Sequence, residues 1–485
     1  MTKETSSSLT HSAPSLTGRA GGESAGGESL LILGAGPGGY RAAAYAAQKG
    51  LKVTVIEAAE AGGTCLNCGC IPTKSLCHDA EIGSRDFAAV MARKDEVVTS
   101  LRSGVETILS APNISLVRGR AQFINNNTVR VGDEEYTADN IIIATGSRAK
   151  LPPIPGIDSP RVVTSTEMLA LNEKPERLCI IGAGVIGLEF ASCFSAFGSK
   201  VTVIEFMKEC LPTMDSDIAK RLRKTLEKRG IEFHLQSAVE SIEDKSDCAV
   251  VHFKKESKKK ILPPTTSLPP TGSLPPTGGV GEGPGEGPGE RPGEGLSTVE
   301  ADLVLVATGR AANIEGLNLE ATSVQTDRRG IVVNPETFEA APHVYAIGDV
   351  NGRQMLAHAA TYQGLRAVNH ILGIKDNIRL DIMPAAVFTH PEAASVGPTE
   401  DQSFTVHKAI YRANGKALAT ETSEGLVKIL TDESDRIVAA HILGSHAADM
   451  VQEIAALMNC DVTLSHLRDM VHIHPTLAEM LTEVS

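Results

Sequence analysis

The sequence lacks any apolar run that could cross a membrane. The longer apolar stretches among its 485 residues, such as Leu178–Val185, fall well short of the ~18 residues that a transmembrane helix requires. Residues 1–28 also lack the apolar segment of a secretory signal, and they carry too many acidic residues for a transit peptide. They are rich in Ser, Gly and Thr, so we expect a disordered tail here and no membrane partner.

Positive charge is also in deficit, with 46 Lys and Arg residues against 59 Asp and Glu residues and a net charge of −13. This balance disfavours a nucleic-acid partner. The nine cysteines do not have the even spacing of a secreted disulfide scaffold. We therefore expect a reducing compartment, the cytoplasm, with the mitochondrial matrix left open. A disulfide that persists there is more often catalytic than structural.

The chain is too long for a single hydrophobic core and predicts about three or four domains. A low-complexity segment over about residues 254–298 contains a lysine-rich run, Leu-Pro-Pro-Thr repeats and a Gly-Glu-Gly-Pro tract. Such a segment cannot bury enough apolar surface to fold, and a long surface insertion costs little because loop-closure entropy grows only logarithmically. We expect a disordered insertion that replaces a hairpin turn between two strands.

A strand–turn–helix–strand unit follows the tail. The apolar strand Ser29–Leu33 leads into Gly34-Ala35-Gly36-Pro37-Gly38-Gly39. A helix is expected over Tyr40–Lys49, and a second strand, Lys52–Ile56, ends at Glu57. The glycines permit a tight turn with a pyrophosphate at the helix N-terminus, and the acid is placed to accept a bond from a ribose hydroxyl. This unit predicts a dinucleotide site.

The same pattern recurs at a constant offset. Arg177–Ile181 leads into Gly182-Ala183-Gly184-Val185-Ile186-Gly187, a helix is expected over Leu188–Ala196, and the strand Lys200–Ile204 ends at Glu205. Two such sites indicate two cofactors that exchange electrons, rather than one site and one relic. Because a carboxylate repels a 2′-phosphate and no arginine follows Glu205, we expect NAD and not NADP here.

Further apolar strands end in short motifs that are typical of the edge of a nucleotide site in a parallel sheet. We expect strands over Ile141–Gly146 and Leu303–Gly309, which end in Thr-Gly, and over Val344–Asp349, which ends in Gly-Asp. The last hundred residues alternate strands and helices without a glycine-rich signature, so they form a separate domain. The predicted fold class is α/β, with two Rossmann-like dinucleotide-binding domains and a C-terminal α+β domain.

Just downstream of the first unit, Cys65 and Cys70 lie five positions apart. On a regular helix their side chains would point well away from each other, whereas a disulfide needs the Cα atoms within roughly 7 Å. A bridge therefore requires a distorted turn, for which Gly69 and Pro72 provide the backbone means. Our hypothesis is a redox-active disulfide beside a flavin.

Cys68 opens an alternative, since Cys65-x-x-Cys68 with Cys70 and either Cys77 or His78 has the composition of a zinc site. We disfavour a metal, because zinc sites form their own modules and the dinucleotide context already accounts for two of these cysteines. Because Cys68 is a third cysteine in this stretch, it remains open which two of the cysteines form the disulfide under oxidising conditions. The remaining cysteines are interpreted as core or surface residues: Cys179, Cys193, Cys210, Cys248 and Cys460.

Together these motifs resemble the pyridine nucleotide-disulfide oxidoreductase family, and within it the dihydrolipoamide dehydrogenases. The resemblance runs from about Leu30 to Glu479. It is carried by Gly62–Lys74, Gly182–Glu189, Ala307–Arg310, Ala346–Asp349, Met355–Ala359, Phe388–Glu392 and His474–Glu479. It implies FAD-binding domain segments over 29–150 and 313–381, an NAD-binding domain over 151–312 and a dimerisation domain over 382–485.

The resemblance implies FAD on the first unit and NAD on the second. The FAD contacts it implies are Gly34, Gly36, Gly39, Glu57, Lys74, Gly119, Asp349 and Ala357. The NAD contacts it implies are Gly182, Gly184, Gly187, Glu205 and Gly309. Lys74 would lie near the flavin ring and pair with Glu189, rather than form a surface salt bridge.

The implied reaction is oxidation of protein-bound dihydrolipoamide to lipoamide with NAD as hydride acceptor. The substrate thiolate would attack Cys65 and release Cys70 beside the flavin. His474 from the partner subunit of a homodimer would act as the base, and Glu479 would orient it. The implied partners are the lipoyl domains and acyltransferase core of a 2-oxo acid dehydrogenase complex, or the glycine cleavage H protein.

Relatives with other substrates are the main alternative. Glutathione-type reductases would want basic residues near Glu205, and these are absent. Mercuric and long thioredoxin reductases carry a C-terminal cysteine pair, which Leu481–Ser485 does not contain. A non-catalytic flavoprotein docking subunit is a further alternative, which the intact set of redox and acid–base residues disfavours.

Overall fold

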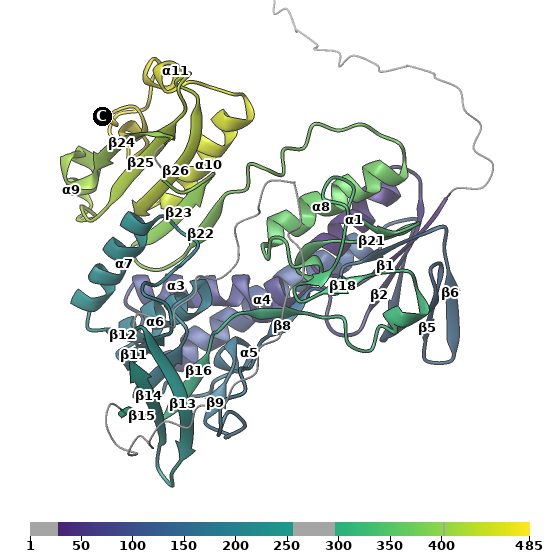
Figure 1. The fold of residues 1–485 in the computed structure, drawn as a ribbon, viewed down its shortest axis with the longest axis horizontal. Coiled ribbons are helices and arrows are strands. Elements are labelled where there is room, and N and C mark those ends of the chain that lie inside the picture. The colour runs from purple at the N-terminus through teal and green to yellow at the C-terminus, as the bar shows by residue number, and fades with distance from the viewer. Residues whose placement is uncertain (1–27, 256–295, 401–402) are drawn as a thin grey trace, which may run out of the picture.

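A computed structural model describes residues 28–255, 296–400 and 403–485 (Figure 1). The three largest sheets in these ranges, one of six strands and two of five, form the centres of three bodies, which Figure 1 shows next to one another. The expected disorder of the tail and of the insertion concerns residues 1–27 and 256–295, which lie outside the described ranges. The bounds predicted for the insertion, 254–298, are too wide, because Lys254 and Lys255 end one strand and residues 296–298 begin the next. Within the described ranges, no helix is both long and apolar enough to cross a membrane.

The first sheet has six strands in the order β20-β21-β7-β1-β2-β3, all parallel except β20. These strands span Glu339–Ala341, Val344–Ala346, Asn140–Ile143, Ser29–Leu33, Lys52–Glu57 and Ile114–Arg118. The strand order places β1 in the interior of the sheet, so its C-terminal end opens on the crevice where nucleotides bind in such folds.

The two faces of the first sheet are covered differently. Leu30 and Ile32 pack with helices α1 (Pro37–Gln48) and α8 (Ala357–Ile371). Leu31 and Leu33 pack on the opposite side, with the antiparallel strands β4–β6 (Ala121–Asn125, Thr128–Val131 and Glu134–Thr137). Successive strand residues point to opposite faces, which explains why β1 is apolar throughout instead of alternating.

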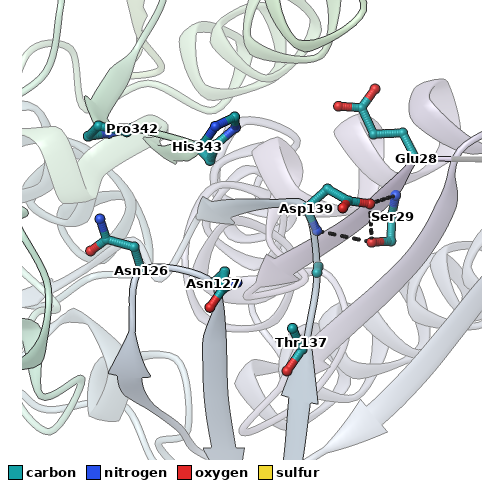
Figure 2. A pocket seen from close by; sticks show the side chains of 9 residues that line it. Glu28, Ser29, Asn126, Asn127, Thr137, Asp139, Pro342 and His343 are labelled. Atoms are coloured by element: carbon teal, nitrogen blue, oxygen red, sulfur yellow. Dashed lines mark hydrogen bonds between the residues drawn. The ribbon is translucent and has the colours of Figure 1, made fainter.

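The described chain enters this sheet beside a hollow whose lining includes Asn126, Asn127, Thr137, Pro342 and His343 (Figure 2). Asp139, which precedes β7, accepts hydrogen bonds from the Ser29 backbone nitrogen at 2.8 Å and from its hydroxyl at 2.7 Å. Figure 2 shows both bonds as dashed lines. They fix the start of β1 against β7, and hence the position at which β1 ends in the glycine turn.

The second sheet is parallel, with the order β12-β11-β10-β16-β9. Its strands span Glu232–Leu235, Lys200–Glu205, Arg177–Ile181, Leu303–Val306 and Val162–Val163, and α6 (Val185–Ala196) follows β10. A three-stranded antiparallel sheet packs on it, formed by β13 (Ser237–Asp244), β14 (Ala249–Lys255) and β15 (Leu296–Ala301). Strands β14 and β15 pair with each other, so the insertion joins the arms of a hairpin, as predicted.

The third sheet is antiparallel, in the order β22-β23-β26-β25-β24. Its strands span Ala385–Val387, Glu392–Val396, Ile437–Gly444, Leu426–Thr431 and Thr405–Ile410. Helices α10 (Ala447–Asn459) and α11 (Leu464–Arg468) contribute buried residues to the core on this sheet. Together the three sheets confirm the predicted fold class of two nucleotide-binding domains and a C-terminal α+β domain.

Three consecutive helices join β2 to β3 of the first sheet: α2 (Gly63–Cys68), α3 (Cys70–Glu81) and α4 (Phe87–Leu109). Helix α3 packs against both α4 and α6, and Figure 1 shows α3 next to α6. The cysteine stretch therefore lies where the two nucleotide-binding bodies meet.

The predicted element boundaries are wrong at the nucleotide turns. Helices α1 and α6 begin three residues earlier than expected, at Pro37 and Val185, because the end of each glycine turn already forms the first helical turn, and Pro is well suited to that position. The strands β7, β16 and β21 end earlier than expected, at Ile143, Val306 and Ala346. Past β7 and β21 the chain leaves the sheet, and residues such as Gly146 and Asp349 line a cavity instead.

Candidate active site

A large cavity of about 1490 Å³ lies where the three bodies meet, since residues of the third body such as Ala385 and Val451 line it together with residues of the first two. Its lining includes most of the residues that the sequence assigned to the first cofactor and to the redox centre: Gly34, Gly36, Glu57, Cys65, Cys70, Lys74, Gly119, Glu189, Asp349 and Ala357. Gly39 and the predicted NAD contacts Gly182, Gly184, Gly187, Glu205 and Gly309 are not part of this lining, and neither are His474 and Glu479.

The first glycine turn has the shape that a dinucleotide requires. Gly34 has a φ of +107°, and a Cβ there would lie 2.4 Å from the Ala144 carbonyl oxygen. Gly36 forms the N-cap of α1 without a side-chain hydrogen bond, so the amides of the first turn are left for a ligand. Gly39 acts through packing, because a Cβ would lie 1.9 Å from the Gly34 carbonyl oxygen. These residues fit the pyrophosphate of FAD.

Glu57 holds this turn in place. Its carboxylate accepts hydrogen bonds from the backbone nitrogens of Ala35 at 2.6 Å and Ala59 at 2.8 Å. Each carboxylate oxygen has a second lone pair, so these bonds leave room for a ribose hydroxyl. The acid that was predicted as a ribose contact therefore also positions the backbone of the loop.

The second glycine turn repeats this geometry. Gly182 also has a φ of +107°, and a Cβ there would lie 2.6 Å from the Ala307 carbonyl oxygen. Glu205 accepts hydrogen bonds from the backbone nitrogens of Ala183 at 2.6 Å and Met207 at 2.7 Å. A Cβ at Gly187 would lie 2.1 Å from the Gly182 oxygen, whereas Gly184 and Gly309 face open space. The turn fits a second dinucleotide.

The cysteine pair lies across a break between two helices. Cys65 is on α2 and Cys70 begins α3, with Gly69 between them at a φ of −149° and a ψ of −115°. A Cβ at Gly69 would lie 2.8 Å from the Thr64 carbonyl oxygen, so only glycine allows this close approach. The distorted turn expected at Gly69 is present, and it brings the two thiols into hydrogen-bonding contact.

The two thiols differ in acidity. The hydrogen bond from Cys65 lowers the pKa of Cys70 to about 7; burial opposes this shift and the Lys74 ammonium supports it. The same hydrogen bond, with burial, raises the pKa of Cys65. Both cysteines are free in this structure, and Cys70 is the more acidic of the two because the hydrogen bond shifts their pKa values in opposite directions.

Lys74 is held by a nearly buried acid. Its Nζ lies 2.9 Å and 2.8 Å from the two carboxylate oxygens of Glu189 on α6, and 4.7 Å from the centroid of the Phe388 ring. The Phe388 backbone nitrogen also donates to Glu189 at 3.0 Å. Burial disfavours the Lys74 charge, but the attraction to Glu189 outweighs it and raises the Lys74 pKa. The cation therefore stays charged next to the Cys70 sulfur.

Cys68 has a different environment from its neighbours. It lines the same cavity, and burial raises its pKa against the opposing hydrogen bond from Thr166 and the charge of Arg310. Among the described residues, no group of three or more His, Cys, Asp or Glu side chains is arranged to hold a metal ion.

His474 and Glu479 form a hydrogen-bonded pair on the surface of the third body. His474 Nδ1 lies 2.9 Å from Glu479 Oε1, and the other carboxylate oxygen accepts from the Thr476 backbone nitrogen at 2.8 Å. The His474 side chain is 81% exposed. With Nδ1 turned to a carboxylate, the other ring nitrogen, Nε2, takes no part in this pair. His472 pairs separately with Glu453 at 2.9 Å.

Two residues to which the sequence analysis assigned no role, Arg310 and Ser147, contact Asp349 in the second segment of the first body, beside the cavity. Arg310 donates to the hydroxyl and carbonyl oxygens of Ser147, both at 2.7 Å. Ser147 in turn donates to Asp349, whose carboxylate lies 3.8 Å from the Arg310 Nε. Arg310 directly follows the Thr-Gly motif, but only the pairing of β17 (Arg310–Ala312) with β8 (Ser147–Ala149) reveals its partner.

Comparison with known proteins agrees with this geometry. Residues 28–364 match the pyridine nucleotide-disulphide oxidoreductase family, and residues 383–485 match its dimerisation domain. The chain belongs to this family. Membership confirms the predicted flavin disulfide oxidoreductase class and its two cofactors, FAD and NAD(H), and the dimerisation domain supports a homodimer.

Individual members of the family are similar over nearly the whole chain. Dihydrolipoyl dehydrogenase 1, mitochondrial, from Arabidopsis thaliana is 37% identical over 94% of this chain and 89% of its own length. Dihydrolipoyl dehydrogenase from Chlamydia muridarum is 37% identical over 93% of this chain and 95% of its own. The solved structure of the HOCl-induced flavoprotein disulfide reductase RclA from Escherichia coli matches with a TM-score of 0.80 at 31% identity, over 94% of this chain and 99% of that one.

Proposed function

We propose that this protein is a dihydrolipoyl dehydrogenase, which oxidises protein-bound dihydrolipoamide to lipoamide and passes the electrons to NAD. The observation that carries the proposal is the Cys65–Cys70 thiol pair in the wall of the dinucleotide cavity, with Cys70 as the more acidic member. The 37% identity to two dihydrolipoyl dehydrogenases supports this choice of substrate.

In the proposed reaction the oxidised pair is a Cys65–Cys70 disulfide. A dihydrolipoamide thiolate attacks Cys65, and Cys70 leaves as a thiolate. The low pKa of Cys70 makes it the better leaving group of the two. The second substrate thiol then attacks the mixed disulfide at the substrate sulfur, which releases lipoamide and leaves Cys65 as a thiol. Bound FAD would supply the electron acceptor for the reduced pair and deliver the electrons to NAD.

Lys74 has an electrostatic role in this proposal. Its ammonium, kept charged by Glu189, stabilises the Cys70 thiolate that each exchange produces. The phenyl ring of Phe388 covers the cation, and its backbone nitrogen fixes the Glu189 carboxylate. The three residues come from all three bodies of the chain, so this contact depends on how the bodies are docked.

The acid–base group comes from the second subunit in this proposal. His474 is exposed on its own chain and its pair with Glu479 does not line the cavity of that chain. In a homodimer the dimerisation domain of one subunit would present His474 Nε2 to the other subunit's Cys65. The imidazole would take the proton from the substrate thiol, and Glu479 would stabilise the imidazolium.

The choice of NAD over NADP rests on Glu205 in this proposal. The carboxylate is nearly buried and held by two backbone nitrogens, so it cannot turn away from a 2′-phosphate. The neutral variant Glu205→Gln retains a side-chain oxygen that can accept a hydrogen bond but loses the negative charge. We expect the ratio of kcat/KM with NAD to kcat/KM with NADP to fall roughly tenfold in this variant. Equal wild-type rates with NADH and NADPH would exclude this assignment.

The proposed partners follow from the substrate. They are the lipoyl domains and acyltransferase core of a 2-oxo acid dehydrogenase complex, or the glycine cleavage H protein. The proposed location is the cytoplasm or the mitochondrial matrix. It draws on the mitochondrial and bacterial relatives.

A substrate comparison tests the function. The holoenzyme is assayed with dihydrolipoamide and NAD, with lipoamide and NADH, and with glutathione disulfide and either coenzyme. We expect turnover of the lipoyl substrates to exceed that of glutathione disulfide by more than ~100-fold. Cys65→Ser is expected to abolish it and Cys68→Ser to preserve it. Full activity of Cys65→Ser, loss in Cys68→Ser, or a preference for glutathione disulfide would overturn the proposal.

A further inference from the structure

A second pair of cysteines lies in contact across the interface of the nucleotide-binding bodies. The Sγ atom of Cys193 is 3.0 Å from the Sγ atom of Cys77. A disulfide bond is ~2.05 Å long, so the two sulfurs need to approach by only about 1 Å to be bonded. Cys77 is on α3 of the first body and Cys193 is on α6 of the second, 116 positions apart in the sequence.

The surrounding contacts hold the two sulfurs at this distance. Cys77 lies three residues after Lys74 on α3, and Cys193 lies four residues after Glu189 on α6, so each cysteine shares a helix face with one member of the ion pair. The Lys74–Glu189 pair and the cysteine pair are therefore successive contacts across one helix–helix interface. The same core cluster contains Cys193 and has Cys77 packed against it.

The two thiols are not equivalent. Cys193 donates its proton to Cys77, and this bond together with burial raises the pKa of Cys193. Cys193 is 2% exposed, whereas Cys77 is only partly buried. The Lys74 ammonium lies close enough to interact with both sulfurs. Cys77 is thus the sulfur that an oxidant can reach, with a thiol beside it to complete the reaction.

We propose that Cys77 and Cys193 are a site of oxidative modification, where a peroxide forms a second disulfide that joins the two nucleotide-binding bodies. The Cys77 thiol gives up its proton to solvent, and its sulfur attacks one peroxide oxygen, so that the oxygen–oxygen bond breaks and Cys77 becomes a sulfenic acid. The departing hydroxide takes up a proton from solvent and leaves as the first water. The Cys193 thiol then displaces the second water, and the sulfur–sulfur bond forms. Two thiols are oxidised and one hydrogen peroxide is reduced to two waters, so atoms and electrons balance.

This bond differs from the proposed catalytic disulfide in position and consequence. Cys77 does not line the cavity, and it lies two helical turns along α3 from Cys70, about 10 Å away at 1.5 Å per residue. The two pairs therefore cannot exchange without a large movement of the helix. A Cys77–Cys193 bond closes a long loop and fastens α3 to α6, which restrains the unfolded chain and stabilises the docking of the two bodies.

The experiment detects the bond directly in the FAD-loaded protein. A Cys65→Ser/Cys70→Ser background removes the other pair, and the folded holoprotein is treated with stoichiometric hydrogen peroxide. Remaining thiols are then alkylated before digestion. We expect a peptide pair linked through Cys77 and Cys193, lighter by two hydrogen atoms than its reduced parts and split by dithiothreitol. Oxidation should also raise the midpoint of thermal unfolding by ~5 °C, reversibly.

Matched variants make the result specific. Cys460→Ser, an exposed cysteine in the third body, should retain both the linked peptide and the thermal shift. Cys77→Ser should lose both, and since Cys77 is only partly buried this variant avoids the packing defect expected at Cys193. The proposal is overturned if Cys77 and Cys193 are both alkylated after peroxide, if Cys77 is found only as sulfinic acid, or if either sulfur is linked to a different cysteine.

Discussion

Lys74 and Glu189 form a bidentate ion pair between helices α3 and α6, with the Lys74 Nζ 2.9 Å and 2.8 Å from the two carboxylate oxygens. Their side chains are 30% and 4% exposed, so the acid is buried and the base keeps some access to water. Removing the cation alone leaves a buried carboxylate without a counter-charge, and this lowers stability more than replacing both charged groups together. The charge of Lys74 therefore contributes to the docking of the two nucleotide-binding bodies, beside the apolar core that α3 and α6 share.

We predict that Lys74→Met destabilises the holoenzyme by about 2 kcal/mol, because it leaves Glu189 buried without a cation. The double variant Lys74→Met/Glu189→Gln should recover most of this loss, since a glutamine oxygen can still accept from the Phe388 nitrogen. Urea unfolding of the three proteins measures the difference. The control Lys228→Met removes a surface pair with Glu424 and should cost less than ~0.5 kcal/mol. Equal stability of the single and double variants would contradict this account.

The acidity of Cys70 gives a second prediction, because its pKa of about 7 is set first by the hydrogen bond from Cys65. Cys65→Ser keeps a hydroxyl donor, whereas Cys65→Ala removes the donor. The hydrogen bond lowers the Cys70 pKa and so keeps Cys70 ionised down to neutral pH. In Cys65→Ala the hydrogen bond is absent, so the Cys70 pKa rises and less of Cys70 is thiolate near neutral pH. We expect Cys70 of Cys65→Ala to react with iodoacetamide roughly fivefold more slowly at pH ~7 than Cys70 of Cys65→Ser.

The measurement follows alkylation of Cys70 by peptide mass spectrometry between about pH 5 and pH 9. The alkylation rates of Cys70 in the two variants should converge at the alkaline end, where Cys70 is fully ionised in both. Identical profiles would show that the Lys74 charge, and not the Cys65 hydrogen bond, dominates the acidity of Cys70.

The parts of the fold that were predicted correctly depend on short stretches of chain. Each dinucleotide unit carries its own signal in a buried strand, a glycine turn and a terminal acid, and β10 (Arg177–Ile181) begins and ends where the sequence placed it. The break between α2 and α3 was also readable from Gly69, since a glycine between two cysteines marks a backbone that a side chain would obstruct. These constraints are steric and act between residues that are close in the sequence, so they can be predicted from a single sequence.

The parts that were missed join residues far apart in the chain. Cys193 was interpreted as a core or surface residue, and Cys77 was considered only as a zinc ligand, because nothing near either of them indicates a partner 116 positions away. Arg310 and Ser147 meet only through the pairing of β17 with β8. The exposure of His474 likewise follows from the packing of the third body, and the roles of all these residues remain predictions for experiment.

The glycine turns allow a test that separates packing from ligand contact. Gly39 was predicted as an FAD contact, yet it lies outside the cavity and acts through the close approach of α1 to the Gly34 oxygen. We expect Gly39→Ala to purify with less than ~10% of the wild-type FAD, because a Cβ 1.9 Å from that oxygen displaces the turn. Gly104→Ala on α4 meets open space, and it should retain FAD and gain slightly in stability. Full FAD content of Gly39→Ala, measured by absorbance per chain, would exclude this role.

The surface pair His474–Glu479 gives the last prediction, which separates thiol chemistry from the rest of the reaction. His474→Gln should lower kcat with dihydrolipoamide by about 10³-fold, because a glutamine side chain cannot take up the proton of the substrate thiol as the proposed base would. Its oxidation of NADH by ferricyanide should stay near the wild-type rate, because that acceptor bypasses the thiol exchange. The control His472→Gln changes the contacts with Glu453 and with the Met470 carbonyl oxygen but leaves the His474–Glu479 pair in place, and it should change kcat by less than ~3-fold. If both reactions of His474→Gln fall together, the residue supports the fold or the dimer and is not the base.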